Sequence, residues 1–392
     1  MDKEGKYFIS ILSDHISQKK TEPQSDIDWK KIYKLAHNHQ VGGIVYRQCK
    51  SFLPDDINAC FFEQYAVALY SYANYSNEIN ILKDTFLEQN VEMFTVKGLD
   101  IAQYYPFPAL RTMGDIDIVV HTDKRTKADE ILHQLQYTAH SRREDIEWMY
   151  RKQGMIIELH DHLVYKQVIN KNEIEGFFNN CWIYVERGKM DASFHFLYLF
   201  AHLRKHLMNS GIGFRQFMDI AIMSKNETAL NWEWIEKKLI ELNLKDFSSM
   251  CFGFIQKWFD ITIPIAVKKE IEDEFYKDVT NQILDNGVFG FDNLENTTNA
   301  AVNAARKNKV SCIGMLKSAL WYVFPSYQAL SDMKYYPYLA GKPFLLPVAW
   351  IHRFFRGICI WNFTRAKRRM KLKFASSETI KKRDEYLKKW GL

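Results

Sequence analysis

The stretch RTMGDIDIVV, residues 111–120, places two aspartates inside a run of residues that favour a buried strand. Four of these residues are β-branched aliphatics, which pack well on a pleated sheet. Asp115 and Asp117 lie two positions apart, so on a strand they share one face. Like charges side by side on a strand repel each other. A fold that contains this strand must therefore bring positive charge to the two carboxylates.

A divalent cation between Asp115 and Asp117 would supply this charge, because Mg²⁺ prefers carboxylate oxygens and is usually held by one or two carboxylates with substrate phosphates. Glu158 lies in a second β-rich apolar run, MIIELH. If the two strands are neighbours, three carboxylates converge, and such a set can hold two divalent ions that clamp a phosphoryl displacement. His160 shares the face of Glu158 and is a candidate for a supporting or substrate contact, with core and solvent as alternatives. Two simpler interpretations stay open for the acids: a common acidic pair at a strand end, and an edge strand with Glu158 in water.

Three residues near the aspartate strand are candidates to bind phosphate. Lys97 and Gly98 follow the short strand VEMFTV and precede a helical pattern. A helix N-terminus favours anions, Gly98 permits close approach of the backbone, and Lys97 adds a positive charge. Arg111, just ahead of the aspartate strand, is the third candidate. Asp100 in the same first turn would oppose an anion, and its alternative role is to complement the helix dipole.

Three histidines, His195, His202 and His206, are spaced seven and four residues apart and share one face of a predicted helix. A pair at i and i+4 can bind zinc, but no nearby carboxylate completes such a motif. We therefore expect this helix to pack beside the active cleft. Arg215 and Asp219, also four residues apart, predict an ion pair within one helix.

The chain is long enough, at 392 residues of which 47% are hydrophobic, for two or three domains with sizeable cores. Apolar residues recur at helical spacing over 26–49 and over roughly 59–89. Gln153-Gly154 predicts a hairpin turn, and Thr122 or Asp123 is the expected cap of the helix after the aspartate strand. We predict an α+β fold, a small mixed-sheet core flanked by helical N-terminal and C-terminal regions. The expected division is a helical region at 1–75, the core at 76–190, a helical domain at 191–305, and an aromatic and basic region at 306–392.

Cysteine usage and the apolar pattern favour a cytoplasmic protein. The six cysteines are scattered without a CxxC pair, which is typical of reduced thiols and argues against a disulfide framework or a zinc site. The first residues lack the cationic and apolar segments of a secretory signal, and no run of 18 apolar residues is present. We therefore expect a cytoplasmic location.

The C-terminal end is strongly basic. From Arg353 onward there are 13 Lys and Arg against 3 Asp and Glu, a net charge of +10 in a chain whose total is +6. Together with aromatic residues that suit a membrane interface, this charge predicts that residues 353–392 dock an anionic surface, either the inner face of the membrane or nucleic acid. A solvated basic helix is the open alternative. The candidate interfacial anchors are Trp350, Phe354, Phe355, Trp361 and Phe363.

The motifs taken together resemble a known family. VKGLDIAQYYPFPALRTMGDIDIVV, followed further along the chain by IIELHDHL, is similar to the pattern of the uncharacterised nucleotidyltransferase family of bacteria, within the DNA polymerase β-like nucleotidyltransferase superfamily. AHLRKH, GIGFRQFMDIAI, ILDNGVFG and YPYLAGKPFLLP fit the same pattern. By this resemblance, Asp115 and Asp117 are the metal-binding pair and Glu158 is the third carboxylate of a nucleotidyltransferase core. One departure is the phosphate turn, where most of the superfamily has Gly-Gly or Gly-Ser and this chain has Lys97-Gly98.

The resemblance implies an enzyme that moves a nucleoside monophosphate from an NTP to an acceptor hydroxyl, phosphate or amine and releases pyrophosphate. Two Mg²⁺ ions, with Mn²⁺ as the alternative, are the implied cofactors, and the NTP and an unidentified acceptor are the implied partners. The rival interpretation is a non-catalytic binding protein that keeps the fold as a scaffold and docks a membrane or nucleic acid through its tail. If a cation is what reconciles the aspartates, Asp117→Asn ends their repulsion, and we expect the metal-free variant to be at least as stable as the wild type.

Overall fold

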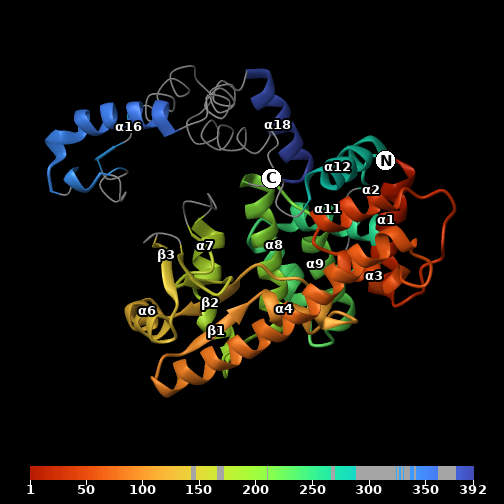
Figure 1. The fold of residues 1–392 in the computed structure, drawn as a ribbon, viewed down its shortest axis with the longest axis horizontal. Helices are drawn as coiled ribbons and strands as arrows, with labels where there is room; N and C mark the ends of the chain where they lie inside the picture. The colour runs from red at the N-terminus through yellow and green to blue at the C-terminus, as the bar shows by residue number, and fades with distance from the viewer. Residues whose placement is uncertain are drawn as a thin grey trace. The chain divides into compact units, whose positions relative to one another are not determined.

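The computed structural model describes residues 1–142, 147–165, 172–209, 211–265 and 270–287 and, further along the chain, residues 324, 326–327, 330, 336–339, 341–360 and 377–392. The chain forms two compact units (Figure 1). Residues 1–207 and 211–291 make up the first unit, and residues 208–210 and 292–390 belong to the second. The finer division expected at residues 75, 190 and 305 stays a prediction.

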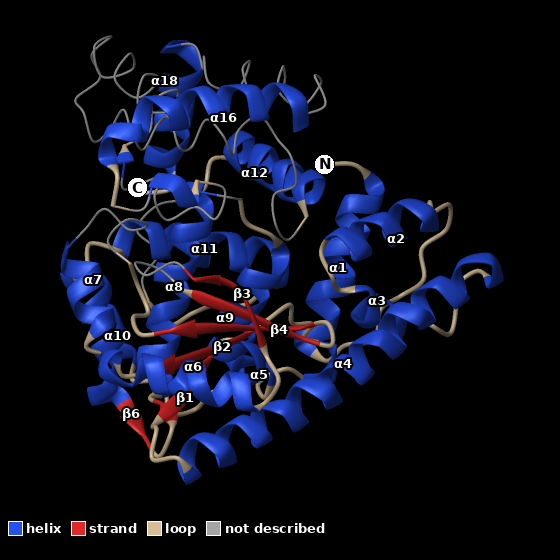
Figure 2. Ribbon diagram, turned by 60° about the vertical axis from the view of Figure 1, so that its left-hand side comes forward, coloured by secondary structure: helices blue, strands red, loops and turns tan. Residues whose placement is uncertain are grey.

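A five-stranded sheet is the framework of the first unit, and Figure 2 shows its strands surrounded by helices. Its strand order is β1-β2-β5-β4-β3, in which β2 and β5 run parallel and the other neighbours run antiparallel. Gln153 and Gly154 form the predicted hairpin turn between β4 and β5, and both have the positive φ (48° and 85°) that a tight hairpin needs. The predicted α+β fold with a mixed sheet is therefore confirmed. The strands are β1 (Met93–Val96), β2 (Ile116–Val120), β3 (Thr138–Arg142), β4 (Trp148–Lys152) and β5 (Met155–His160).

Alternation along β2 and β5 separates an apolar face of the sheet from a polar one. The apolar face is buried in a core cluster with side chains of α4 (Asp55–Glu88) and α6 (Arg125–Gln134). Because successive side chains point to opposite faces, Asp117 and Glu158 project from the other face. The register pairs these two residues directly across the parallel strands. The buried strand residues are Ile116, Ile118, Val120, Ile157 and Leu159.

The helices up to α6 agree with the sequence pattern except at two points. The single helix expected over 26–49 is two helices, because the chain turns at Gln40, whose φ is 56°. Thr122 and Asp123 do not cap α6. They lie in a short 3-10 turn, η2 (Thr122–Lys124), and the N-cap position is occupied by Lys124. The helices are α1 (Lys3–Ser17), α2 (Trp29–Asn38), α3 (Gly42–Cys49), α4 and the short α5 (Gly98–Ala102).

After the sheet the described chain is mainly helical, as predicted. A small hairpin of β6 (Val185–Glu186) and β7 (Lys189–Met190) precedes the helices. None of the helices in the described part of the chain is long and apolar enough to cross a membrane. The helices are α7 (Asn172–Asn179), α8 (Ala192–Asn209), α9 (Phe214–Asn226), α10 (Trp232–Glu241), α11 (Lys245–Phe259) and α12 (Asp273–Asn286), with α16 (Leu346–Ile360) and α18 (Ser377–Lys389) in the second unit.

Candidate active site

The polar face of the sheet gathers carboxylates and an imidazole. His160 Nε2 lies 3.1 Å from Asp117 Oδ1 and 3.5 Å from Glu158 Oε2. One ligand atom of each of these three residues lies within 4.8 Å of the other two. Within the described ranges, this is the one group of three or more metal-ligating side chains that lie so close together. Two carboxylates that the sequence separates by about forty positions thus meet because their strands are parallel neighbours.

Asp115 lies just ahead of β2 and is half-buried. Burial and the carboxylate of Asp117 raise its pKa to about 6, and Lys97 opposes this rise. Glu158 also raises the pKa of Asp115, which places all three acids in one electrostatic group. Asp117 and Glu158 lie with His160 in the close cluster, and Asp115 interacts with both acids electrostatically. The roles of the three acids as metal ligands and catalytic residues stay predictions.

The positive charge opposite Asp117 is the ammonium of Lys97, whose Nζ lies 2.9 Å from Asp117 Oδ1. The Asp117 side chain is only 4% exposed and that of Lys97 16% exposed. Burial alone would raise the pKa of Asp117 and lower that of Lys97, but their mutual attraction outweighs burial, so the acid's pKa is low and the amine's pKa is high. The two side chains therefore form an ion pair. Lys97, expected to contact phosphate, is here the counter-ion of a carboxylate.

Lys97 occupies a strained turn between β1 and α5. Its backbone has φ 59° and ψ −127°, a conformation that favours glycine, and Gly98 follows with φ 35°. A non-glycine residue held in such a region costs roughly 1–3 kcal/mol and usually marks a functional site. The Lys97 amide N–H donates to Nε2 of His195, 3.0 Å away. Because burial, then Arg111 and Lys97, lower the pKa of His195 to about 4, this imidazole is neutral and its Nε2 can accept the bond.

We expect His195→Phe to lower the free energy of unfolding by about 1–3 kcal/mol, because the variant leaves the Lys97 N–H without its acceptor. His195→Gln keeps an oxygen acceptor on a side chain of similar length and should lose less. Urea unfolding of both variants measures the difference. Equal losses would mean that His195 only fills space and that the turn does not depend on this bond.

The other two histidines of α8 extend the cluster. His202 Nε2 lies 3.3 Å from Lys97 Nζ, and His206 Nε2 lies 3.1 Å from His202 Nε2. Burial lowers the pKa of both, that of His206 to about 3, so both imidazoles are neutral. The expectation that this helix packs beside the carboxylates is confirmed. The alternative of zinc binding finds no support, because the ammonium of Lys97 faces the pair and the described residues place no third ligand there.

Arg111 is buried and pairs with a carboxylate, and its predicted contact with phosphate stays a prediction. Its guanidinium makes two bonds to the buried carboxylate of Asp219 in α9, Nη2–Oδ2 at 2.8 Å and Nε–Oδ1 at 3.2 Å. The Tyr105 hydroxyl donates to the same carboxylate at 2.7 Å. The ion pair expected between Arg215 and Asp219 is wrong, because Arg215 donates instead to the side chain of Gln40 and the carbonyl of Thr112. A planar guanidinium fork matches a carboxylate well, so Arg111 ties the segment ahead of β2 to α9.

A comparison with protein-family models matched residues 25–260 to the family described as Uncharacterised nucleotidyltransferase. The chain belongs to this family. The matched range contains the whole five-stranded sheet and helices α8 and α9. Searches of curated proteins and of solved structures found no match.

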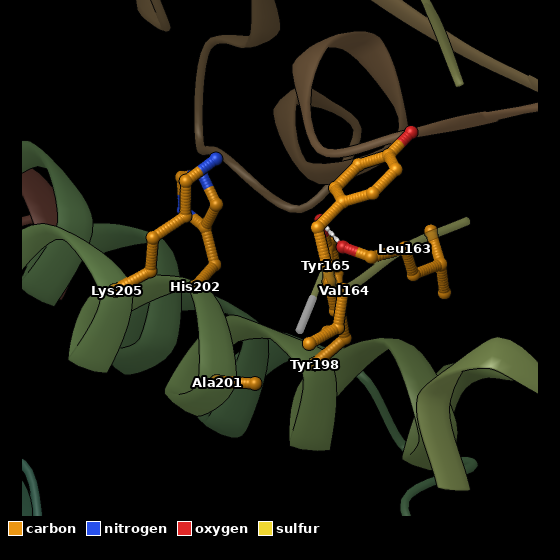
Figure 3. A pocket seen from close by; sticks show the side chains of 7 residues that line it. All are labelled: Leu163, Val164, Tyr165, Tyr198, Ala201, His202 and Lys205. Atoms are coloured by element: carbon orange, nitrogen blue, oxygen red, sulfur yellow. Dashed lines mark hydrogen bonds between the residues drawn. The ribbon is translucent and has the colours of Figure 1, made fainter. Parts of the chain in front are cut away.

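A pocket opens beside the carboxylate group, between α8 and the residues that follow β5 (Figure 3). Its enclosed volume is small, about 10 Å³, which is room for about one water molecule. Its wall includes His202, which contacts Lys97, and Tyr165, whose ring lies 6.3 Å from that of His160. The pocket therefore touches the candidate active site at two points. Its lining residues are Leu163, Val164, Tyr165, Tyr198, Ala201, His202 and Lys205.

Proposed function

We propose that this protein is a metal-dependent nucleotidyltransferase that moves a nucleoside monophosphate from an NTP to an unidentified acceptor and releases pyrophosphate. The observation that carries the proposal is the direct register of Asp117 with Glu158 on parallel strands, with Asp115 beside them. The family match supports general nucleotidyl transfer. The acceptor and the metal belong to the proposal.

The donor set fits a hard divalent cation. The Lys97 ammonium pairs with Asp117, and the raised pKa of Asp115 reflects burial and its repulsion by Asp117. Carboxylate oxygens suit Mg²⁺, and Mn²⁺ is the alternative because one imidazole, His160, adjoins the set. Asp115, Asp117 and Glu158 would hold two such ions. When bound, the ions would neutralise the triphosphate and lower the pKa of the acceptor.

The chain's own side chains would then position the reacting groups and accept the proton. The acceptor oxygen loses its proton and attacks the α-phosphorus while the bond to the β-phosphate breaks. Glu158 or Asp117 would take that proton, and His160 would orient both carboxylates through its contacts of 3.5 Å and 3.1 Å. Lys97, once a cation replaces it beside Asp117, would meet a phosphate oxygen at the turn that Gly98 leaves open. Catalysis would then rest mainly on positioning and charge neutralisation.

The test is incubation of the protein with Mg²⁺ and each NTP labelled at the α-phosphate, followed by detection of labelled product and free pyrophosphate. We expect pyrophosphate release that needs the divalent cation and that Asp115→Asn and Asp117→Asn both abolish. Because the acceptor is unknown, cell extract provides candidate acceptors in the assay. Release that persists unchanged in both variants would contradict the proposed site.

We further propose that the C-terminal region binds an anionic membrane surface. Phe344, in the 3-10 turn η5 (Pro343–Leu345) just ahead of α16, is 74% exposed. Val348 and Ile351 of α16 are 52% and 58% exposed, and their spacing of three puts them on one side of that helix. Exposed apolar side chains next to a net charge of +10 favour lipid over nucleic acid as the partner. Of the expected anchors, Trp350 packs against Phe324 at 5.1 Å. The side chains of the other four, Phe354, Phe355, Trp361 and Phe363, lie outside the described residues.

Binding to vesicles of mixed anionic and neutral phospholipid should fall when the chain is truncated after Arg365 and when salt is added, because polybasic attraction is worth about 1 kcal/mol per charge and is screened. The double variant Phe344→Ser with Ile351→Ser should weaken the part of the vesicle binding that persists in high salt. Phe62→Ser, at an exposed position of α4, is the matched control. Co-sedimentation with the vesicles measures binding in each case: the truncated chain, added salt, the double variant and the control. Absence of binding by the full chain would favour the solvated-helix alternative.

A further inference from the structure

The His160 imidazole contacts both of the carboxylates that β2 and β5 bring together. It ends β5, two positions after Glu158, so both side chains lie on the polar face of the sheet. Its Nε2 lies 3.1 Å from Asp117 Oδ1 and 3.5 Å from Glu158 Oε2, so one nitrogen faces both acids. The other ring nitrogen, Nδ1, is buried and has no hydrogen-bond partner in the described part of the chain. The two acids are therefore what holds this ring on its polar side.

The spacing of these atoms matches that of neighbouring ligands around one small cation. Small divalent ions bind oxygen and nitrogen at about 2.0–2.2 Å, so two ligands at a right angle lie about 3 Å apart. Both separations from His160 Nε2 are close to this value, and all three ligand atoms lie within 4.8 Å of one another. The Glu158 side chain is 22% exposed, against 4% for Asp117, so the group is open to an ion on the Glu158 side.

A donor set of two carboxylates and one imidazole favours a first-row transition ion over Mg²⁺. Mg²⁺ takes oxygen ligands and loses its water reluctantly, whereas transition ions bind mixed nitrogen and oxygen sites with an affinity that rises from Mn²⁺ to Co²⁺ and beyond. The Lys97 ammonium contacts the same Asp117 oxygen at 2.9 Å, so an incoming ion has to displace it. A bond to nitrogen offsets part of this cost for a transition ion, and Mg²⁺ gains much less from it.

We propose that His160 is a direct metal ligand through Nε2, and that with Asp117 and Glu158 it binds a first-row transition ion, Mn²⁺ or Co²⁺, in preference to Mg²⁺. This role goes beyond orienting the two carboxylates, because the imidazole itself selects the ion. The inference rests on the proposed transferase function for the use of the metal, but the metal site needs neither nucleotide nor turnover.

The probe is Mn²⁺, added to the full-length protein without nucleotide. Electron paramagnetic resonance measures the free ion, and the spin-echo modulation of the bound ion detects a directly bonded nitrogen. We expect nitrogen coupling in the wild type, and Mn²⁺ binding about tenfold or more tighter than Mg²⁺ binding in a competition titration.

His160→Gln should abolish the nitrogen coupling and weaken Mn²⁺ binding by about tenfold or more, because one ligand is lost. Mg²⁺ binding should change by no more than about threefold, since its oxygen ligands remain. His162→Gln is the matched control and should change neither. His162 also pairs with an acid, Asp161 at 3.0 Å, but its side chain is 41% exposed.

The nitrogen coupling decides between a ligand and a supporting residue, because loss of a residue that only orients a ligand also costs about 10–100-fold in metal affinity. The proposal is overturned if the wild type binds no Mn²⁺, binds it without nitrogen coupling, or binds it no more tightly than Mg²⁺. Coupling that persists in His160→Gln overturns it as well. The wild-type spectrum decides even if His160→Gln does not fold.

The same measurements separate this site from the proposed function. Mn²⁺ bound through nitrogen by a protein that transfers no nucleotide would contradict the proposed function and leave the metal site intact. Mg²⁺-dependent transfer by a protein whose bound Mn²⁺ shows no nitrogen coupling would do the reverse.

Discussion

Asp115→Asn and Asp117→Asn should both abolish nucleotidyl transfer, by about a hundredfold or more, yet change the stability of the metal-free protein in opposite directions. Asp117 is the partner of the buried Lys97 ammonium, so its neutralisation leaves that charge unpaired. We expect a loss of about 3 kcal/mol in the free energy of unfolding, at the low end for a broken buried ion pair. This result would reverse the expectation drawn from the sequence alone, where repulsion by Asp115 was the only known interaction.

Asp115→Asn should instead raise the free energy of unfolding at pH 7 by about 1–3 kcal/mol, because each unit of pKa shift corresponds to about 1.4 kcal/mol. Burial and Asp117 raise the folded-state pKa of Asp115 to about 6, above its usual 3.8. The folded protein therefore holds this proton more tightly than the unfolded chain, and the wild type loses stability as pH rises from about 4 to about 6. The advantage of the variant should be full above pH 6 and absent below pH 4.

Urea unfolding of the wild type and both variants across this pH range, without metal, measures these effects. Comparison of the two variants controls for the loss of one carboxylate, since each removes one negative charge from the same group. If both stabilise the protein, Lys97 does not pair with Asp117 in solution. If both destabilise it equally, the two aspartates act as structural hydrogen-bond acceptors.

Arg111→Met should destabilise the protein by about 3–5 kcal/mol, because it leaves the buried carboxylate of Asp219 without its guanidinium. Both side chains are at most 8% exposed, and they join the segment ahead of β2 to α9. The double variant Arg111→Met with Asp219→Leu should recover most of this loss, since it removes both charges. Thermal or urea unfolding of the single and double variants makes the measurement.

Arg142→Met is the control for the Arg111 prediction. Arg142 also pairs with an aspartate, Asp129, but its side chain is 44% exposed. Loss of such a surface pair should cost no more than about 1 kcal/mol. A cost for Arg111→Met as small as that for Arg142→Met would contradict the structural role of the buried pair and would return Arg111 to the candidates for phosphate binding.

The sequence by itself determined the strands that present the carboxylates. Strand propensity and two-residue alternation are local properties, so the pattern of β2 and β5 already placed Asp117 and Glu158 opposite a hydrophobic face. The hairpin at Gln153-Gly154 was equally local, because Gly154 adopts positive φ at no steric cost. Helix caps were less predictable: a single 3-10 turn ahead of α6 moved the N-cap from Thr122 or Asp123 to Lys124.

Only the tertiary structure decided which charges meet. Lys97 and Asp117 are 20 positions apart, and Arg111 and Asp219 are 108 apart, so no periodicity relates them. Local spacing favoured Arg215 as the partner of Asp219, but the folded chain brings the Arg111 guanidinium to that carboxylate and gives Arg215 other acceptors. Long-range ion pairs depend on how loops pack against helices, and burial then fixes them, because an unpaired charge in a low-dielectric interior is too costly to remain.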